Sequence, residues 1–184
     1  AKVADFGLVK LLGGTSVAIS EAATRLVGTL GYMDPEYCSS HKPSLAVDVY
    51  SFGVVMLVVL TGRKAVLVIE DDHVNIKRRV APLVISGAVA EFKDPRLEAP
   101  DGLVLHLARL ALSCTLPGVS RPSMLQVLAE LVRIKQEMFG VRVSAEVSGI
   151  DTEIGGSDGS YDFSAEMARA MQEAVSGPQL PIVP

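Results

Sequence analysis

The chain has 184 residues, of which 49% are hydrophobic and 21% charged, with a formal net charge of −4 at pH 7. This length suits one domain with a sizeable core plus a tail, and the hydrophobic content excludes general disorder. The negative charge gives no reason to expect nucleic acid or an anionic membrane as partner. Two cysteines are too few for a disulfide framework, and we recognise no targeting or membrane-spanning segment, so a reducing, cytoplasmic compartment is expected.

The first residues predict a short strand. The chain begins with Ala1, within a run that alternates apolar and polar residues, as if cut from a longer protein. The strand ends in a turn at Gly7. Taken alone, the triplet Asp5-Phe6-Gly7 is a weak signal, because an aspartate at a strand end often only caps the turn.

A long loop follows, in which glycines interleave with serine and threonine over residues 9–33. Long loops in compact domains are uncommon and usually functional. The loop closes at Pro35, which stops the preceding structure, and Glu36 opens a short helical turn.

The most apolar stretch lies at residues 52–60, where only Gly53 interrupts the large apolar side chains. A helix that is apolar on every side must run through a core, and this one is too short to span a membrane. A buried strand is the alternative, because short apolar runs are ambiguous. The length of the pattern, Ser44 as a possible N-cap and Gly62 as a possible C-terminal residue favour a central core helix.

Three more helices are predicted by apolar periodicity, at residues 73–86, at 101–115 and, after a capping box, at 123–138. His106 and Cys114 lie on the second of these. Both are interpreted as packing residues and not metal ligands, because no other histidine or cysteine is suitably spaced.

The composition changes after residue 139. Residues 140–184 carry seven acidic and two basic side chains, and residues 150–160 are rich in glycine, serine and aspartate. We therefore expect a folded domain over residues 1–139 and a flexible acidic tail over 140–184.

Four motifs occur in the order and spacing of one known family. They are Asp5-Phe6-Gly7, residues 28–37, residues 48–53 and residues 121–124. In these motifs the chain resembles the eukaryotic protein kinases, of the plant receptor-like and receptor-like cytoplasmic type, and more narrowly a Crinkly4-like subgroup. The resemblance implies a mainly α fold, a fragment of the kinase C-lobe built around one central helix, from a domain that is α+β when intact.

The resemblance implies roles in phosphoryl transfer for several residues. In kinases the aspartate of the Asp-Phe-Gly motif holds Mg²⁺ against the ATP phosphates, so Asp5, with Phe6 and Gly7, is the implied metal- and cofactor-binding motif. Thr29 matches a threonine that bridges to the catalytic aspartate, which favours Ser/Thr over Tyr specificity.

The loop before Gly28 matches the activation segment of kinases, in which phosphorylation acts by pairing with basic side chains. Its candidate phosphorylation sites are Thr24, followed by Thr15, Ser16 and Ser20. A solvated loop hydroxyl is the alternative for each of them.

Three further positions are implied to be structural. Glu36 matches a buried glutamate whose partner is the arginine at the Arg121 position, since neither charge can be buried alone. Asp48 matches an acid that supports the backbone of the catalytic loop, and the alternative is an acid that complements the helix dipole. Val58 stands where the family usually has glutamate and Ala46 where it often has lysine, which indicates relaxed constraint or altered substrate binding.

The other catalytic motifs of kinases precede Asp5 in the family, and this chain starts four residues before Asp5. Two functions stay open: the C-terminal part of a Ser/Thr kinase that transfers the ATP γ-phosphate in signalling, or a catalytically inactive, truncated interaction module. The chain by itself is expected to bind ATP and Mg²⁺ poorly and to phosphorylate nothing. Expected partners are protein substrates or signalling proteins, in the cytoplasm or, for a receptor parent, at the plasma membrane without direct membrane contact by this segment.

Overall fold

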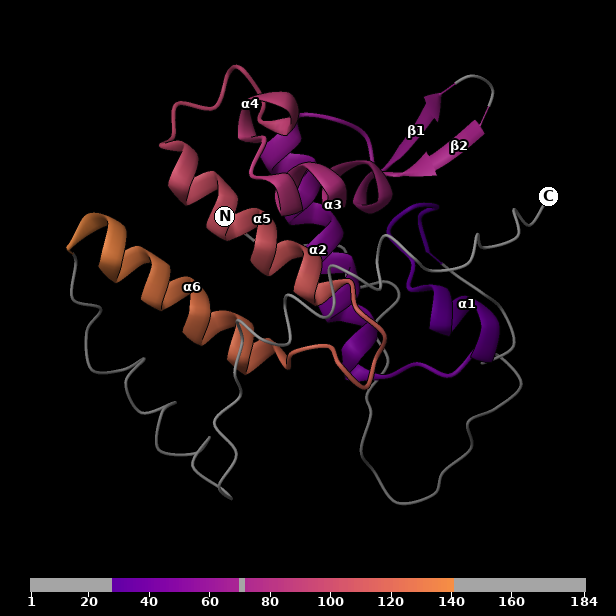
Figure 1. Cartoon of the computed structure of the whole chain (residues 1–184). Coiled ribbons are helices and arrows are strands. Elements are labelled where there is room, and N and C mark those ends of the chain that lie inside the picture. Colours follow the sequence, from indigo (N-terminus) through magenta and orange to yellow (C-terminus); the bar gives the residue numbers. More distant parts are fainter. Residues whose placement is uncertain (1–27, 70–71, 141–184) are drawn as a thin grey trace.

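A computed structural model describes residues 28–69 and 72–140 of the chain (Figure 1). Its elements are α1 (Pro35–Ser40), α2 (Leu45–Thr61), β1 (Val66–Ile69), β2 (Asp72–Asn75), α3 (Ile76–Ser86), α4 (Val89–Phe92), α5 (Asp101–Cys114) and α6 (Met124–Phe139). The predicted mainly α fold is confirmed, with the addition of one two-stranded sheet. The predicted strand at residues 1–8 and the predicted acidic tail lie outside the described residues.

Helix α2 is the predicted central helix, and α3 and α5 pack against it while α6 packs on α5 (Figure 1). It begins after Ser44 and ends at Gly62, whose left-handed φ of 63° lets its N–H bond to the carbonyl of Val58. Val54 and Leu57 are completely buried in the core. The contact with α5 needs a glycine, because a Cβ at Gly53 would lie 2.6 Å from the Cβ of Cys114.

One side of α2 is exposed in the part of the chain that the structure describes, contrary to the prediction that the helix is buried all round. Val55 is 44% exposed and Val59 is 64% exposed. Their spacing of four residues places them on one face, which Asp48 also shares one heptad before Val55. An apolar run shows that burial of every side of a helix would be favourable. It does not show whether other elements of the described part pack against every side.

The predicted helix at residues 73–86 begins three residues later than expected, at Ile76, and a hairpin precedes it. Strands β1 and β2 pair antiparallel, with Val66 opposite Asn75. Asn75 then begins α3 as its N-cap, because its side-chain oxygen accepts the N–H of Lys77 at 3.0 Å. Pairing with β1 therefore decides that residues 73–75 are extended.

The capping box that begins α6 is confirmed. The Ser123 hydroxyl accepts the N–H of Gln126 at 3.3 Å, and the Gln126 side chain accepts the N–H of Ser123 at 2.7 Å. Val127 and Ile134 carry the buried face of this helix.

The two packing residues predicted on α5 differ in outcome. Cys114 is fully buried against α2, as predicted. His106 is exposed, so its predicted packing role is wrong. The apolar spacing of the helix did not show that His106 is exposed to solvent.

Candidate functional site

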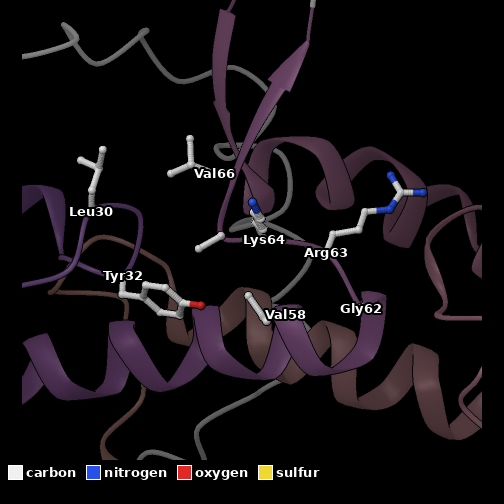
Figure 2. Close-up of a pocket in the computed structure, with 8 residues that line it drawn as sticks. Leu30, Tyr32, Val58, Gly62, Arg63, Lys64 and Val66 are labelled. Atoms are coloured by element: carbon white, nitrogen blue, oxygen red, sulfur yellow. The ribbon is translucent and has the colours of Figure 1, made fainter.

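A pocket with a volume of about 470 Å³ lies between the loop before α1, the end of α2 and the start of β1 (Figure 2). Eight residues line it: Leu30, Tyr32, Val58, Gly62, Arg63, Lys64, Ala65 and Val66. Most of the wall is apolar, and Leu30 is 74% exposed. We refer to this site as the α2–β1 pocket.

The turn after α2, which lines the α2–β1 pocket, depends on local sequence. Gly62 ends α2 in the left-handed conformation, and the chain then returns through the buried Ala65. The carbonyl of Ala65 accepts the N–H of Ile76 at 2.8 Å, which fixes the start of the hairpin. Gly31, at φ 89°, allows the loop to approach β1, since a Cβ there would lie 2.6 Å from a methyl of Val66.

The loop that carries Thr29 is held from two sides. The N–H of Tyr32 bonds to the carbonyl of Thr29 at 3.1 Å, which closes a turn. The Ser51 hydroxyl on α2 donates to the carbonyl of Tyr32 at 2.8 Å, and the Asn75 side chain donates to the carbonyl of Gly31 at 3.3 Å. The side chain of Thr29 is exposed on this anchored turn.

The rim of the α2–β1 pocket is basic. Neither Arg63 nor Lys64 lies within ion-pair distance of a carboxylate in residues 28–69 or 72–140. In Figure 2 Lys64 stands between Val66 and Val58, whereas Arg63 extends away from the other labelled side chains. Lys64 is therefore the cation that a ligand in this pocket would meet.

The carboxylate next to Gly62 belongs to Asp94, and the guanidinium of Arg96 neutralises its charge. Arg96 donates to it from its guanidinium at 2.8 Å and from its main-chain N–H at 2.9 Å. These hydrogen bonds hold the pKa of Asp94 at about 2. This carboxylate therefore does not neutralise Lys64.

The loop that carries Thr29 ends at Asp34, which belongs to a second group of polar side chains. We name this group the Arg121 cluster: Asp34, Tyr50, Lys77 and Arg121. The Arg121 guanidinium bonds to the Asp34 carboxylate at 2.6 Å, and both side chains are at most 3% exposed. Arg121 also donates to the carbonyls of Leu116 at 2.9 Å and Ala46. These bonds tie the start of α1 to α2 and to the segment between α5 and α6.

The predicted pairing of Glu36 with Arg121 is wrong, because Asp34 takes that place. Asp34 is the N-cap of α1, and one of its oxygens accepts the N–H of Glu36 at 3.0 Å. Its other oxygen then reaches Arg121. Glu36 itself is exposed in the first turn, where it accepts the N–H of Gly118 at 2.9 Å. An aspartate directly before a proline is an N-cap signal that could have identified Asp34.

Tyr50 lies against both cations of the Arg121 cluster. Its ring centroid is 5.2 Å from the Arg121 guanidinium carbon and 5.8 Å from the Lys77 ammonium, which itself donates to the carbonyl of Thr115 at 3.1 Å. Burial, followed by the charge of Asp34, raises the pKa of Tyr50 to about 12. Burial also lowers the pKa of Lys77.

The structure separates the other predicted site residues into two sets. Asp48 is exposed in the first turn of α2. Outside the described residues lie Asp5, Phe6, Gly7, Thr15, Ser16, Ser20 and Thr24. Where the chain is described, no group of three or more histidine, cysteine or acidic side chains is arranged to hold a metal ion.

Helices of the described part are all too short or too polar to cross a membrane.

Known proteins resemble this chain over most of its length. A family model described as the protein kinase domain matches residues 1–133. The Arabidopsis thaliana serine/threonine-protein kinase-like protein CCR4 is 36% identical over 137 residues, which cover 71% of this chain and 18% of that protein. The Arabidopsis thaliana proline-rich receptor-like protein kinase PERK4 is 31% identical over 192 residues, which cover 99% of this chain and 30% of that protein.

A solved structure also matches. It is the pseudokinase domain of BIR2, described as an immune regulator of the RLK/Pelle family, with a TM-score of 0.55 and 31% identity over 67% of this chain and 38% of that chain. The chain thus spans under a third of the length of CCR4 and PERK4 and under half of the BIR2 chain.

Proposed function

We propose that this chain, which belongs to the protein kinase family, is the substrate-side part of a Ser/Thr kinase whose parent transfers the γ-phosphate of ATP to protein substrates in signalling. The observation that carries this proposal is the exposed Thr29 on an anchored turn beside the α2–β1 pocket. One relative named a serine/threonine-protein kinase and another named a serine/threonine-protein kinase-like protein support the residue class of the substrate.

Phosphoryl transfer depends mostly on positioning and charge stabilisation, with little covalent chemistry for the protein. Thr29 closes the turn through its carbonyl and is itself exposed, so its hydroxyl can bond to a catalytic aspartate of the intact enzyme. Ser51 and Asn75 bond to the carbonyls of Tyr32 and Gly31, and these bonds fix the turn that presents Thr29. In this proposal Thr29 positions the acceptor hydroxyl against the base of the intact enzyme.

The uncovered face of α2 supports the proposal that more kinase polypeptide packs on this chain. Val55 and Val59 are exposed on the most apolar helix of the fold. Exposed apolar side chains that share a helix face often mark a contact surface. In the intact kinase we place the segment with the catalytic loop here, where Asp48 would accept main-chain N–H groups of that loop.

ATP and Mg²⁺ belong to the proposed reaction of the intact kinase. The nucleotide supplies the phosphoryl group, and the hard Mg²⁺ ion prefers oxygen ligands such as the Asp5 carboxylate. Asp5 lies outside the described residues, so its role is proposed from the sequence motif alone. We expect the 184-residue chain by itself to bind both groups weakly, because Mg²⁺ gives up its waters reluctantly and a single aspartate is a weak site for it.

The test is a phosphorylation assay on a protein extended upstream to a complete kinase domain. With labelled ATP, Mg²⁺ and a generic Ser/Thr peptide, we expect incorporation that Asp5→Asn abolishes. Thr29→Ser, which keeps the hydroxyl, should retain activity, whereas Thr29→Val should lower kcat by about tenfold or more. Equal incorporation by Asp5→Asn, or none by the extended protein, would contradict the proposal.

The second candidate function is a catalytically inactive interaction module. Two observations favour it: the similarity to a structure described as a pseudokinase, and the valine at position 58 in place of the usual glutamate. Translation of the genomic sequence upstream of Ala1 separates the two functions. An in-frame His-Arg-Asp…Asn loop supports the kinase, and a stop codon or a degenerate loop supports the module.

The proposed location is the cytoplasm, at the inner side of the plasma membrane if the parent is a receptor. Relatives named receptor-like kinases motivate this placement. A fluorescent fusion of the full-length parent, imaged in plant cells, tests it, and signal in a secretory lumen would contradict it.

A further inference from the structure

We propose that the α2–β1 pocket binds a peptide in which an apolar side chain stands next to an acidic residue. The apolar side chain enters between Leu30, Tyr32 and Val58, and the acidic side chain pairs with Lys64. That this peptide is the kinase's substrate rests on the proposed function, whereas the binding itself does not.

The apolar half of the inference comes from the wall of the pocket. Leu30 is 74% exposed, and Val58 and Val66 are half-buried at the opening. In Figure 2 the side chains of Leu30, Val66 and Val58 border a common space, and the Tyr32 ring lies along one side of it. A volume of about 470 Å³ is within the usual range for ligand pockets. An apolar side chain of the peptide that enters this space would remove these apolar surfaces from water, which favours binding.

The acidic half comes from charge. Lys64 contacts no carboxylate among the described residues, and the nearby Asp94 is already bonded to Arg96. Position 58 holds a valine, so this part of the wall adds no negative charge. A ligand with a basic side chain would meet the like charge of Lys64, whereas an acidic one would gain an ion pair.

A peptide is the occupant because a strand edge adjoins the pocket. Val66 lines the pocket and is also the first residue of β1. Within residues 28–69 and 72–140, β1 pairs with β2 alone, so its second edge forms no ladder. An extended peptide can use the N–H and C=O groups of such an edge while its side chains enter the neighbouring pocket.

The experiment measures fluorescence anisotropy of labelled peptides with the 184-residue chain. Three peptides are compared, with a central leucine flanked by glutamates, a central leucine flanked by lysines, and a central serine flanked by glutamates. We expect the first to bind about tenfold more tightly than either of the others, with affinity that weakens as salt is added. Equal binding of all three peptides, or no binding of the first, overturns the proposal.

Three variants and a matched control locate the site. Lys64→Ala should weaken binding of the acidic peptide about threefold, and Lys64→Glu should make the lysine-flanked peptide the tighter ligand. Val58→Glu should weaken the acidic peptide by about as much as Lys64→Glu does. Arg79→Glu, which changes an exposed cation of α3 that does not line the pocket, should leave the order of affinities unchanged.

The outcomes keep this inference separate from the proposed kinase activity. Lys64 is exposed, so its variants are expected to fold, and a circular dichroism spectrum of each variant beside wild type checks this. Failure of Lys64→Glu to change the preference overturns the pocket assignment, whether or not the extended protein phosphorylates anything. Loss of kinase activity with unchanged peptide binding would contradict only the proposed function.

Discussion

The loop from Leu30 to Asp34 borders two regions of opposite character. On one side the Arg121 cluster is closed, and its ion pair is at most 3% exposed. On the other side the α2–β1 pocket is open, with an exposed leucine and a lysine that no described carboxylate neutralises. The Arg121 cluster thus fixes one end of the loop in the fold, whereas the α2–β1 pocket leaves the other end open to a ligand.

The difference shows how polar groups divide between stability and recognition. A buried charge is costly unless its partners lie in the fold, so the removal of one member of the Arg121 cluster leaves another without compensation. An exposed charge interacts with water, so its removal costs the fold little but changes what a ligand meets. The predictions below test this contrast.

The largest expected effect is on the buried ion pair. Arg121→Ala should lower the free energy of unfolding by about 3–5 kcal/mol, because the Asp34 carboxylate stays buried without its partner. The double variant Asp34→Asn with Arg121→Met should recover part of this loss. Urea denaturation of each variant gives the values, and equal stability of Arg121→Ala and wild type would rule out the ion pair.

A second test of the closed region uses Tyr50. Its folded-state pKa of about 12 exceeds the ordinary value of about 10, so the folded state keeps the phenol proton over this interval while the unfolded state loses it. Stability from Tyr50 is therefore fully present below pH 10 and is lost as the pH rises through 12, by about 2–3 kcal/mol in total.

The control for this pH dependence is Tyr50→Phe, which removes the titrating group and keeps the ring. The lowered pKa of Lys77 acts in the opposite direction, since there the unfolded state binds more protons. We therefore compare wild type with Tyr50→Phe at each pH between 10 and 12. Unfolding free energies that run parallel for the two proteins would show that Tyr50 is open to solvent.

Glu36 should have a smaller effect than Arg121. Glu36→Ala removes an exposed hydrogen bond to Gly118 and is expected to cost about 1 kcal/mol, and Glu36→Gln, which keeps an acceptor, should cost less. Thermal unfolding measures both. A loss as large as that of Arg121→Ala would restore Glu36 as the buried partner of Arg121.

The smallest effect on stability is expected in the α2–β1 pocket. Lys64→Glu should change the free energy of unfolding by no more than about 0.5 kcal/mol, because the side chain is exposed and contacts no described carboxylate. Chemical denaturation beside wild type measures it. A loss of several kcal/mol would mean that Lys64 supports the fold and that the contrast between the two regions is wrong.

Much of the local structure was predictable because its causes are local. Gly62 ends α2 because a left-handed residue is needed there. Ser123 and Gln126 begin α6 because their side chains bond to each other's main-chain N–H groups. The central helix was predictable because the apolar run is longer than a typical strand and lies between Ser44, the N-cap, and Gly62, the C-cap. Membership of the kinase family followed from motifs whose order the sequence displays directly.

The sequence by itself did not determine which residues meet across the fold. Asp34 and Glu36 are both acids near one helix start, and only the packed arrangement places the first against Arg121 and the second in solvent. Residues 73–75 continue a helical pattern but pair with β1, and Val55 and Val59 are as apolar as Val54 but are left uncovered. The physical reason is the same in each case: capping and periodicity act within a few residues, whereas ion pairs, strand pairing and burial depend on neighbours that are distant in the chain and are set by tertiary packing.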